Sequence, residues 1–239
     1  KKCIVDFIFM WGKKNKNYYN QICSGKYFVS GSLKNNLFPI KKASPKNKKK
    51  IIFISQYRHS NEFIKKNFYY YKNLLVKTAI YLKRKNLKLV IIGNQIEKSS
   101  QEFDWYKKIL GEEKFELKIK KKNLDSYKNS LNYQNFICFS SSLGFELASR
   151  DKRVVFFFKN QLGKNSLMYK DSFIGANSGP IWTNKYSHRD IKRLLDYLIY
   201  ASQKKVSIYK KKYVLPFTHY DFRLKNTKKY FEKNNLEIF

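Results

Sequence analysis

The chain has 239 residues, of which 43% are hydrophobic, and its formal charge is +34. This composition is typical of a globular protein with a buried core rather than of a disordered chain. No apolar run approaches the roughly 20 residues that a membrane-spanning helix needs. The three cysteines are scattered and form no CxxC pair, which favours a reducing, cytoplasmic compartment.

The excess of lysine has two explanations. One is an anionic partner, such as nucleic acid, lipid or a phosphorylated substrate. The other is compositional drift in an AT-rich genome, which the spread of lysines through every segment favours. Such a surface still attracts anionic membrane and nucleotides, so the inner face of the membrane is a second expected location. No signature of a specific nucleic-acid-binding module is present.

The first 40 residues form one predicted unit. Its expected elements are a strand over residues 3–11, a helix over 15–22 and a strand over 26–30. The following residues, 41–50, are almost wholly polar and contain Pro45. We therefore predict a domain boundary there, between units spanning residues 1–40 and 51–239.

From Ile51 onward, strand-like and helix-like segments alternate. The predicted strands cover residues 51–55, 87–92, 115–119, 136–139 and 154–158. The predicted helices cover residues 61–85, 101–110 and 124–131. This alternation predicts an α/β domain with a doubly wound parallel sheet. In such sheets ligands lie beyond the carboxyl ends of the strands, so the loops after Ile54, Ile92 and Phe139 are expected to share the functional edge.

The stretch 136–158 is the most informative one. It reads as a strand, a serine-rich turn, a short helix and a second strand. At such a turn the free N–H groups and the positive end of the helix dipole can hold a phosphate. Ser140, Ser141 and Ser142 supply hydroxyls, and Gly144 is expected to let the backbone approach the ligand. An ordinary serine N-cap is the alternative interpretation.

Residues 159–187 are predicted to be irregular and contain Gly179, Pro180 and Trp182. Behind them, residues 187–201 have the apolar spacing of an amphipathic helix, with Ser187 as its N-cap. In the lysine-rich tail we predict one closing helix, over residues 226–233.

These segments together resemble a known family. The motifs that carry the resemblance are the strand end ISQYR, a strand that ends in Gly-Asn, the run SSSLGFELASRDKRVVFF, and SGPIWTN ahead of an amphipathic helix. Their order resembles the carboxyl-terminal domain of bacterial surface-carbohydrate biosynthesis proteins with the Rossmann-like GT-B glycosyltransferase fold. The segment GSLKNN, residues 31–36, resembles the end of that family's amino-terminal α/β domain. The resemblance implies that most of this first domain is missing and that activity needs it.

The resemblance implies transfer of a sugar from a nucleotide-activated donor to a polysaccharide or lipid-linked acceptor, with neither a metal nor a cofactor. The implied donor-binding residues are Ser140, Ser141, Ser142, Gly144, Glu146, Gly93, Asn94, Gly179 and Pro180. Among them the serines and Gly144 hold the phosphate, and Glu146 binds the ribose. Two alternatives stay open: a nucleotide-sugar epimerase of the same fold, and a basic nucleic-acid-binding module.

Arg58 and His59 follow the first strand of the second unit and are the candidate catalytic residues. Arg58 is expected to stabilise the departing phosphate, and His59 to act as a general acid or a phosphate contact. A solvated loop histidine is the alternative for His59, and a partner of the helix dipole is the alternative for Glu146. No cluster of His, Cys, Asp or Glu has the spacing of metal ligands.

Overall fold

The computed structural model describes residues 2–58, 60–111, 114–139, 141–158 and 178–235. Within them lie a small parallel sheet, in which β1 (Cys3–Met10) pairs with β2 (Cys23–Val29), and a seven-stranded sheet. The larger sheet has the order β5-β4-β3-β6-β7-β9-β8 and is parallel except between β8 and β9. The predicted α/β fold class with a mostly parallel, doubly wound sheet is therefore confirmed.

The central strands of the large sheet are continuous apolar runs. Its members are β3 (Lys50–Ile54), β4 (Lys88–Ile92), β5 (Glu116–Lys118), β6 (Asn135–Cys138), β7 (Arg153–Phe157), β8 (Ser178–Gly179) and β9 (Trp182–Thr183). In β3 and β7 every residue after the first is buried. Strands buried on both faces read as unbroken apolar runs rather than as alternating ones, which explains why the sequence revealed them.

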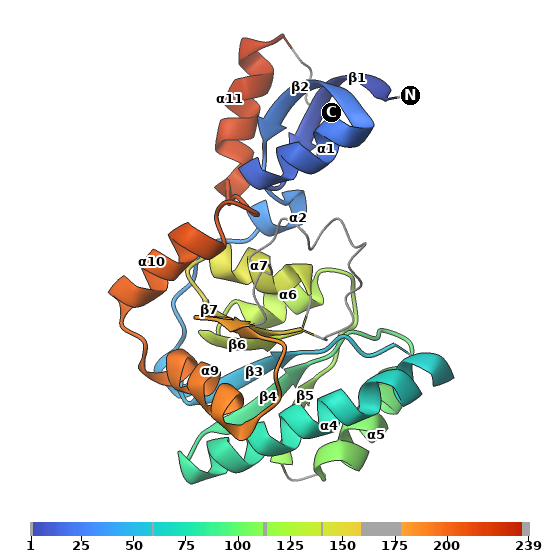
Figure 1. Ribbon diagram of the computed structural model, residues 1–239, viewed down its shortest axis with the longest axis vertical. Helices are drawn as coiled ribbons and strands as arrows, with labels where there is room; N and C mark the ends of the chain where they lie inside the picture. The colour runs from blue at the N-terminus through green and yellow to red at the C-terminus, as the bar shows by residue number, and fades with distance from the viewer. Residues whose placement is uncertain (1, 59, 112–113, 140, 159–177, 236–239) are drawn as a thin grey trace.

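Helices cover both faces of this sheet (Figure 1). On one face lie α4 (Asn61–Arg84), α5 (Ser99–Leu110) and α9 (His188–Tyr200), and on the other lie α6 (Asp125–Ser130) and α7 (Ser142–Ser149). The chain proceeds outward from β3 first through β4 and β5 and then through β6 and β7. Because crossovers between parallel strands are right-handed, the two directions place their helices on opposite faces.

The lysine-rich tail contains a helix that the sequence analysis missed, α10 (Gln203–Tyr213). It begins at Ser202, whose hydroxyl accepts a hydrogen bond from the backbone N–H of Lys205. Val206 is buried, and Tyr209 and Tyr213 pack against the core. Few apolar residues anchor this helix among many lysines, so its hydrophobic periodicity is weak in the sequence.

The remaining elements lie near the two ends of the chain: η1 (Lys13–Asn15), α1 (Lys16–Ile22), α2 (Leu33–Asn36), α3 (Pro45–Lys48), η4 (Phe222–Leu224) and α11 (Lys225–Lys233). The two ends of the chain pack together. The ring of Tyr230 in α11 stacks on Phe28 with 4.1 Å between centroids, and Phe231 stacks on Phe9 at 5.3 Å. The last helix thus lies beside β1 and β2 (Figure 1), whereas the predicted second unit included it. The division at residues 41–50 itself stays a prediction.

Hydrogen bonds connect the small sheet's exit to the large sheet and to the tail. The side-chain amide of Asn35 in α2 donates to the Ser149 hydroxyl at 3.2 Å. Asn36 donates to the carbonyl of Ser30 at 2.8 Å and accepts from the N–H of Asp221 at 2.9 Å. Both asparagines are fully buried. The predicted domain-end segment GSLKNN is therefore a polar junction between three distant parts of the chain.

Lys152 is buried close to this junction. Its ammonium donates to the carbonyls of Lys41 and Leu131, at 2.5 Å and 2.9 Å. Burial, together with the nearby charges of Arg150 and Lys41, lowers the pKa of Lys152 to about 8. The folded protein therefore loses this proton at a lower pH than the unfolded chain does.

We expect this difference to make stability depend on pH. Between about pH 8 and about pH 10 the unfolded state binds the extra proton, so the free energy of unfolding rises with pH. Relative to Lys152→Met, the parent should gain about 1.5 kcal/mol from pH 8 to pH 9.5. Urea unfolding at a series of pH values measures this gain. The exposed Lys48→Met is the control, and identical pH profiles for the parent and Lys152→Met would contradict the assignment.

Candidate functional site at the carboxyl edge of the sheet

The carboxyl ends of β3 and β6 lie side by side and their chains then diverge. Phe53 in β3 pairs with Ile137 in β6, so the loops beginning at Ser55 and Phe139 are neighbours. The first leads into α4 on one face, and the second leads into α7 on the other (Figure 1). This is the topological switch point at which open α/β sheets bind ligands.

A buried carboxylate organises one side of this edge. Glu102, in the first turn of α5, is 1% exposed. Both of its oxygens accept hydrogen bonds from the backbone N–H of Asn94, and Oε2 also accepts from Gln95 at 2.9 Å. The Ser55 hydroxyl donates to Oε1 and itself accepts from the Tyr106 hydroxyl at 2.8 Å. Glu102 therefore ties the ends of β3 and β4 to α5.

Burial and hydrogen bonding shift the pKa of this carboxyl group in opposite directions. Burial raises the pKa of Glu102, while the hydrogen bonds from Ser55 and from the N–H groups of Gln95 and Asn94 oppose that rise. Because both carboxylate oxygens accept hydrogen bonds, the geometry fits the ionised form. In the sequence Glu102 does not stand out, since a glutamate three positions after Ser99 matches an ordinary capping box.

Gly93 and Asn94, two of the predicted donor-binding residues, belong to this network. A side chain at Gly93 would place its Cβ 3.2 Å from Glu102 Oε2 and 3.3 Å from the carbonyl oxygen of Lys118. The side-chain amide of Asn94 donates to the carbonyl of Tyr57 at 3.1 Å. Both residues thus hold the loop after β4 in place, and their role toward a donor stays a prediction.

The start of α7 offers donors toward solvent at the switch point. Ser141 is the N-cap residue, but its side chain makes no capping hydrogen bond with the helix backbone. Ser142, the first helical residue, is exposed, and so is Arg58 on the neighbouring loop. Two other predicted site residues, Ser140 and His59, lie outside the described residues. The fold therefore brings Arg58 to the same edge as Ser141 and Ser142.

Gly144 does not face this edge, which corrects the expected role of its missing side chain. A Cβ built at Gly144 would lie 2.7 Å from Cys138 Sγ and 2.8 Å from Phe156 Cε1. The residue is buried, and its open side faces β6 and β7. Glycine is needed here so that α7 can approach the sheet, and not so that a phosphate can approach the backbone.

Glu146, the predicted ribose ligand, is also buried, with 1% exposure. Its Oε2 accepts a hydrogen bond from the Tyr127 hydroxyl at 2.7 Å. The Tyr127 ring stacks on Phe38 from the junction segment, with 5.1 Å between centroids. Burial and the Glu146 charge raise the pKa of the Tyr127 hydroxyl. The structure therefore buries Glu146 against Tyr127, which Phe38 backs, instead of presenting it at the edge.

Arg150 lies one helical turn beyond Glu146 and was not singled out from the sequence. It is fully buried, and its three guanidinium nitrogens have no hydrogen-bond partner in the described part of the chain. The guanidinium lies over the Phe38 ring, 5.9 Å from its centroid. Burial lowers the pKa of Arg150, while Tyr220 and Glu146 oppose that effect. Only the tertiary structure reveals this group, because the sequence shows an arginine just after a helix end.

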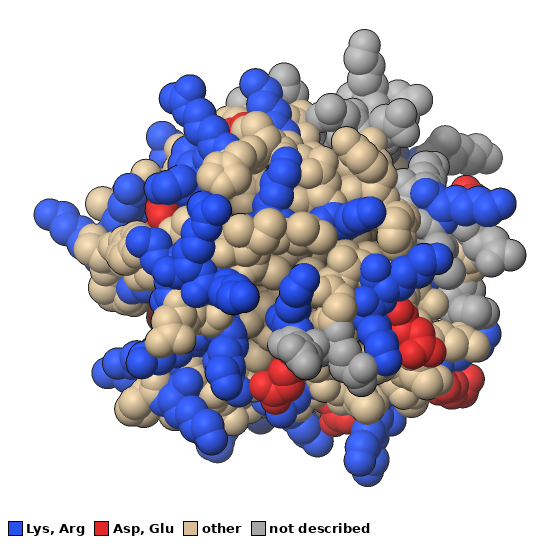
Figure 2. All heavy atoms as spheres, turned by 90° about the horizontal axis from the view of Figure 1, so that it is seen from below, with Lys and Arg blue, Asp and Glu red and all other residues tan. Residues whose placement is uncertain are grey.

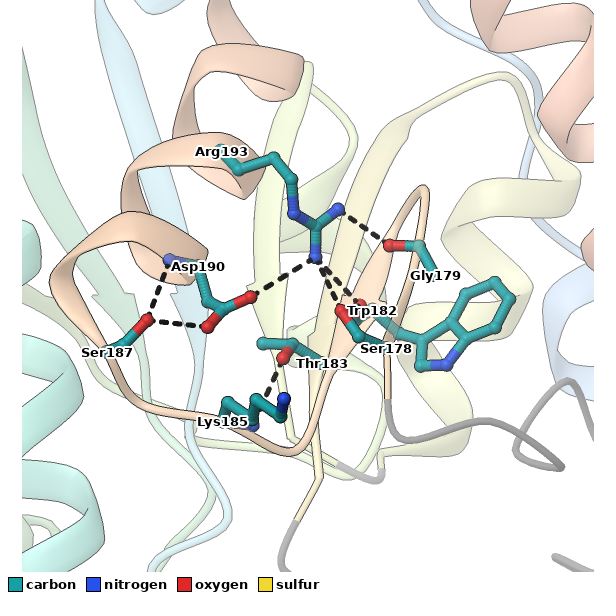
Figure 3. Close-up of polar contacts among 8 residues, drawn as sticks. All are labelled: Ser178, Gly179, Trp182, Thr183, Lys185, Ser187, Asp190 and Arg193. Atoms are coloured by element: carbon teal, nitrogen blue, oxygen red, sulfur yellow. Dashed lines mark hydrogen bonds and ion pairs between the residues drawn. The ribbon is translucent and has the colours of Figure 1, made fainter.

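Gly179 and Pro180 are not brought to the switch point. They form the turn between β8 and β9, and β9 runs parallel to β7. The turn therefore precedes β9 and lies level with the middle of β7 rather than beyond its carboxyl end. Arg193 of α9 holds this hairpin by donating to the carbonyl of Gly179 at 2.7 Å and to the Ser178 hydroxyl at 2.9 Å (Figure 3).

The same close-up shows the start of α9. Ser187 accepts a hydrogen bond from the N–H of Asp190 at 3.1 Å, as the predicted N-cap should (Figure 3). Asp190 in turn lies 3.9 Å from Arg193. These contacts stabilise the hairpin and the helix, and each side chain in them has a structural partner.

The described residues offer neither a metal site nor a membrane-spanning helix. No three His, Cys, Asp or Glu side chains converge there as metal ligands would. None of the helices in the same residues combines the length and apolarity that crossing a bilayer requires.

Comparison with known proteins identifies the family. Over residues 1–235 the chain matches the model of a family described as "putative O-antigen biosynthesis protein". The chain belongs to this O-antigen biosynthesis family. The resemblance to surface-carbohydrate biosynthesis proteins is thereby confirmed at the level of the family.

Two other comparisons add little to this O-antigen family assignment. No curated protein matches the chain. Among solved structures it is similar to the sucrose-phosphate synthase from Thermosynechococcus elongatus, with 8% identity and a TM-score of 0.46. The match covers 96% of this chain and 58% of the synthase chain, so the chain spans less than two thirds of that structure.

In this member of the O-antigen family, Glu102→Gln should destabilise the fold. The glutamine amide would place an N–H donor against backbone N–H groups and leave a buried donor unsatisfied, at a cost of about 1–3 kcal/mol. Glu116→Gln is the control, because Glu116 is 42% exposed and its ion pairs with Lys50 and Lys118 lie near the surface. Chemical denaturation measures both variants, and equal small effects would show that Glu102 does not organise the edge.

Gly144→Ala should be destabilising although alanine favours helices. The new methyl group would overlap Cys138 and Phe156, and such overpacking costs about 1–3 kcal/mol. The same methyl group would leave the nucleotide affinity unchanged, since it points away from the switch point. Unfolding and nucleotide titration together check this prediction, and a stable variant with weakened nucleotide binding would restore the role expected from the sequence.

Proposed function

We propose that the protein is a glycosyltransferase that moves a sugar from a nucleotide-activated donor to a glycan or lipid-linked acceptor. The observation that carries the proposal is the position of α7. Its first turn begins at the switch point of a parallel sheet, in a chain that belongs to an O-antigen biosynthesis family. Building an O-antigen requires the formation of glycosidic bonds, and a helix start at a switch point is suited to a diphosphate.

In the proposed complex the donor diphosphate lies against the start of α7. The N–H of Gly144 already donates to the carbonyl of Ser141 at 3.0 Å. The N–H groups ahead of it in the first turn are those left for an anion, which the positive end of the helix dipole attracts. The Ser141 hydroxyl makes no capping hydrogen bond, and its O–H can donate to a phosphate oxygen. Arg58 on the adjoining loop adds a full positive charge. These groups would stabilise the negative charge that develops on the leaving diphosphate, with no resident metal.

Ribose binding by Glu146 stays part of the proposal under one condition. A ribose hydroxyl can replace the Tyr127 hydroxyl as the donor to Glu146 only if Tyr127 and the stacked Phe38 move away. Phe38 belongs to the junction with the small sheet. Donor binding is therefore expected to coincide with movement of that junction, which hydrogen exchange of its backbone amides can report.

The reaction class is tested by product analysis. The full-length protein is incubated with UDP-, GDP- and CMP-sugars and with a lipid-linked glycan acceptor. A transferase releases the free nucleotide only when the acceptor is present, whereas an epimerase returns an isomeric nucleotide-sugar without any acceptor. Turnover of neither kind, with no nucleotide binding, would reject the proposal.

Ser142→Asp gives a sharper test of the phosphate position. An aspartate in the first turn favours the helix dipole, so folding should be kept or improved. The same charge would repel a phosphate at the start of α7, and nucleotide affinity should fall about tenfold or more. Ser202→Asp, at the start of α10, is the matched control and should leave the affinity unchanged.

Arg58→Ala completes this test by isothermal titration. Loss of one charged hydrogen bond, worth about 1.5–3 kcal/mol, should weaken the nucleotide about tenfold to a hundredfold. Unchanged affinity in both Ser142→Asp and Arg58→Ala would mean that the donor site lies elsewhere on the protein.

A further inference from the structure

A groove of about 1040 Å³ opens at the opposite edge of the large sheet, beside the first residues of β4 and β5. Its walls come from the last turns of α4 and from residues that follow α5, among them Gly111 and Phe115. Val76, Ala79, Leu87 and Phe115 line it and pack against the core while remaining partly uncovered. Ile80 is 48% exposed on its wall. The fold therefore leaves an apolar surface open at this edge.

The rim of the groove is basic. Lys83, Lys88 and Lys114 line it and are exposed. Glu116 is the one carboxylate among the described lining residues, and it is ion-paired with Lys50 at 3.1 Å and with Lys118 at 2.5 Å. Its charge is therefore neutralised from outside the groove. Glu112 and Glu113 lie outside the described residues, so this charge balance covers the described side chains alone.

The wider surface has the same sign. Figure 2 views the molecule from below, the side on which α4 and α5 lie in Figure 1, and Lys and Arg side chains cover far more of it than Asp and Glu do. A broadly positive face attracts any polyanion, but it does not by itself select one. The feature that distinguishes the groove is the apolar floor between the lysines.

We propose that this groove docks the protein on an anionic phospholipid surface. The apolar floor takes part of one acyl chain, and Lys83, Lys88 and Lys114 contact the phosphate of the headgroup. A nucleic acid would satisfy the lysines and leave the apolar floor facing water. A phospholipid satisfies both, because one glycerol unit joins its acyl chains to its phosphate. Basic residues and buried apolar area act together in such peripheral binding, and neither suffices alone.

The site lies at the edge of the sheet opposite to the proposed donor site, because it borders the amino ends of β4 and β5. Docking there would leave the carboxyl edge free. The inference stands apart from the proposed transferase activity, since it depends only on the groove and its charges.

Vesicle co-sedimentation tests the docking with the whole chain. Vesicles of phosphatidylglycerol mixed with phosphatidylcholine are compared with vesicles of phosphatidylcholine alone, and free glycerol phosphate is added as a competitor. We expect binding to the anionic vesicles only, with little competition, because glycerol phosphate lacks the acyl chain. Full competition by glycerol phosphate would mean that the groove binds a phosphate and not a lipid.

Matched variants separate the groove from general charge. Ile80→Ser should weaken partition to the vesicles about tenfold, while Ile208→Ser on α10, where Ile208 is 51% exposed, should not. The double variant Lys83→Ser with Lys88→Ser should weaken partition to the anionic vesicles about thirtyfold. Its control is the double variant Lys204→Ser with Lys211→Ser, at two exposed lysines. Circular dichroism checks that the variants fold. Ile80→Ser should keep the fold, because Ile80 is exposed. Equal losses in the control variants, or no binding to anionic vesicles, would overturn the proposal.

Discussion

Parallel pairing of β3 with both β4 and β6 is the constraint on which the rest of the molecule depends. Strands that run in the same direction cannot be joined by a hairpin, so each connection has to cross a face of the sheet as a helix. These crossovers bury both faces and bring the strand ends to one shared edge. They also place the start of α7 where the loops from β3 and β6 part, and that position carries the proposed function.

Two buried glutamates show how differently the two sides of this scaffold are satisfied. Glu102 accepts hydrogen bonds from two backbone N–H groups and a serine hydroxyl, so its side of the edge is rigidly defined. Glu146 accepts from Tyr127 and lies near Arg150, whose guanidinium makes no hydrogen bond in the described residues. A buried polar group without a partner costs about 1–3 kcal/mol, and more when it is charged. The junction between α7 and the small sheet is therefore the less satisfied of the two regions, and its opening would let water or a ligand reach Arg150.

The net charge of +34 indicates a class of ligand only where lysines border an apolar surface. Lysines spread over the whole chain give a broad positive surface, as expected from compositional drift. At the groove between α4, β4 and β5, three of them surround half-buried apolar side chains, and the nearby carboxylate of Glu116 is already paired. Charge and apolar area then favour the same class of ligand, which a count of lysines cannot show.

The sequence by itself determined the strands from β3 to β7, because those such as 51–54 and 154–157 are buried on both faces and read as unbroken apolar runs. It did not reveal β8 and β9, which lie in the stretch predicted to be irregular and are only two residues long each. It also determined the helix that Ser187 caps, since a cap and its spacing are local features. It could not determine which way Gly144 faces, that Tyr127 contacts the buried Glu146, or that α11 packs on β1 and β2. Each of these depends on contacts between residues far apart in the chain, such as Gly144 with Phe156 and Phe28 with Tyr230. Local patterns record which residues prefer to be buried, but the partner against which each is buried is fixed only when the whole chain packs.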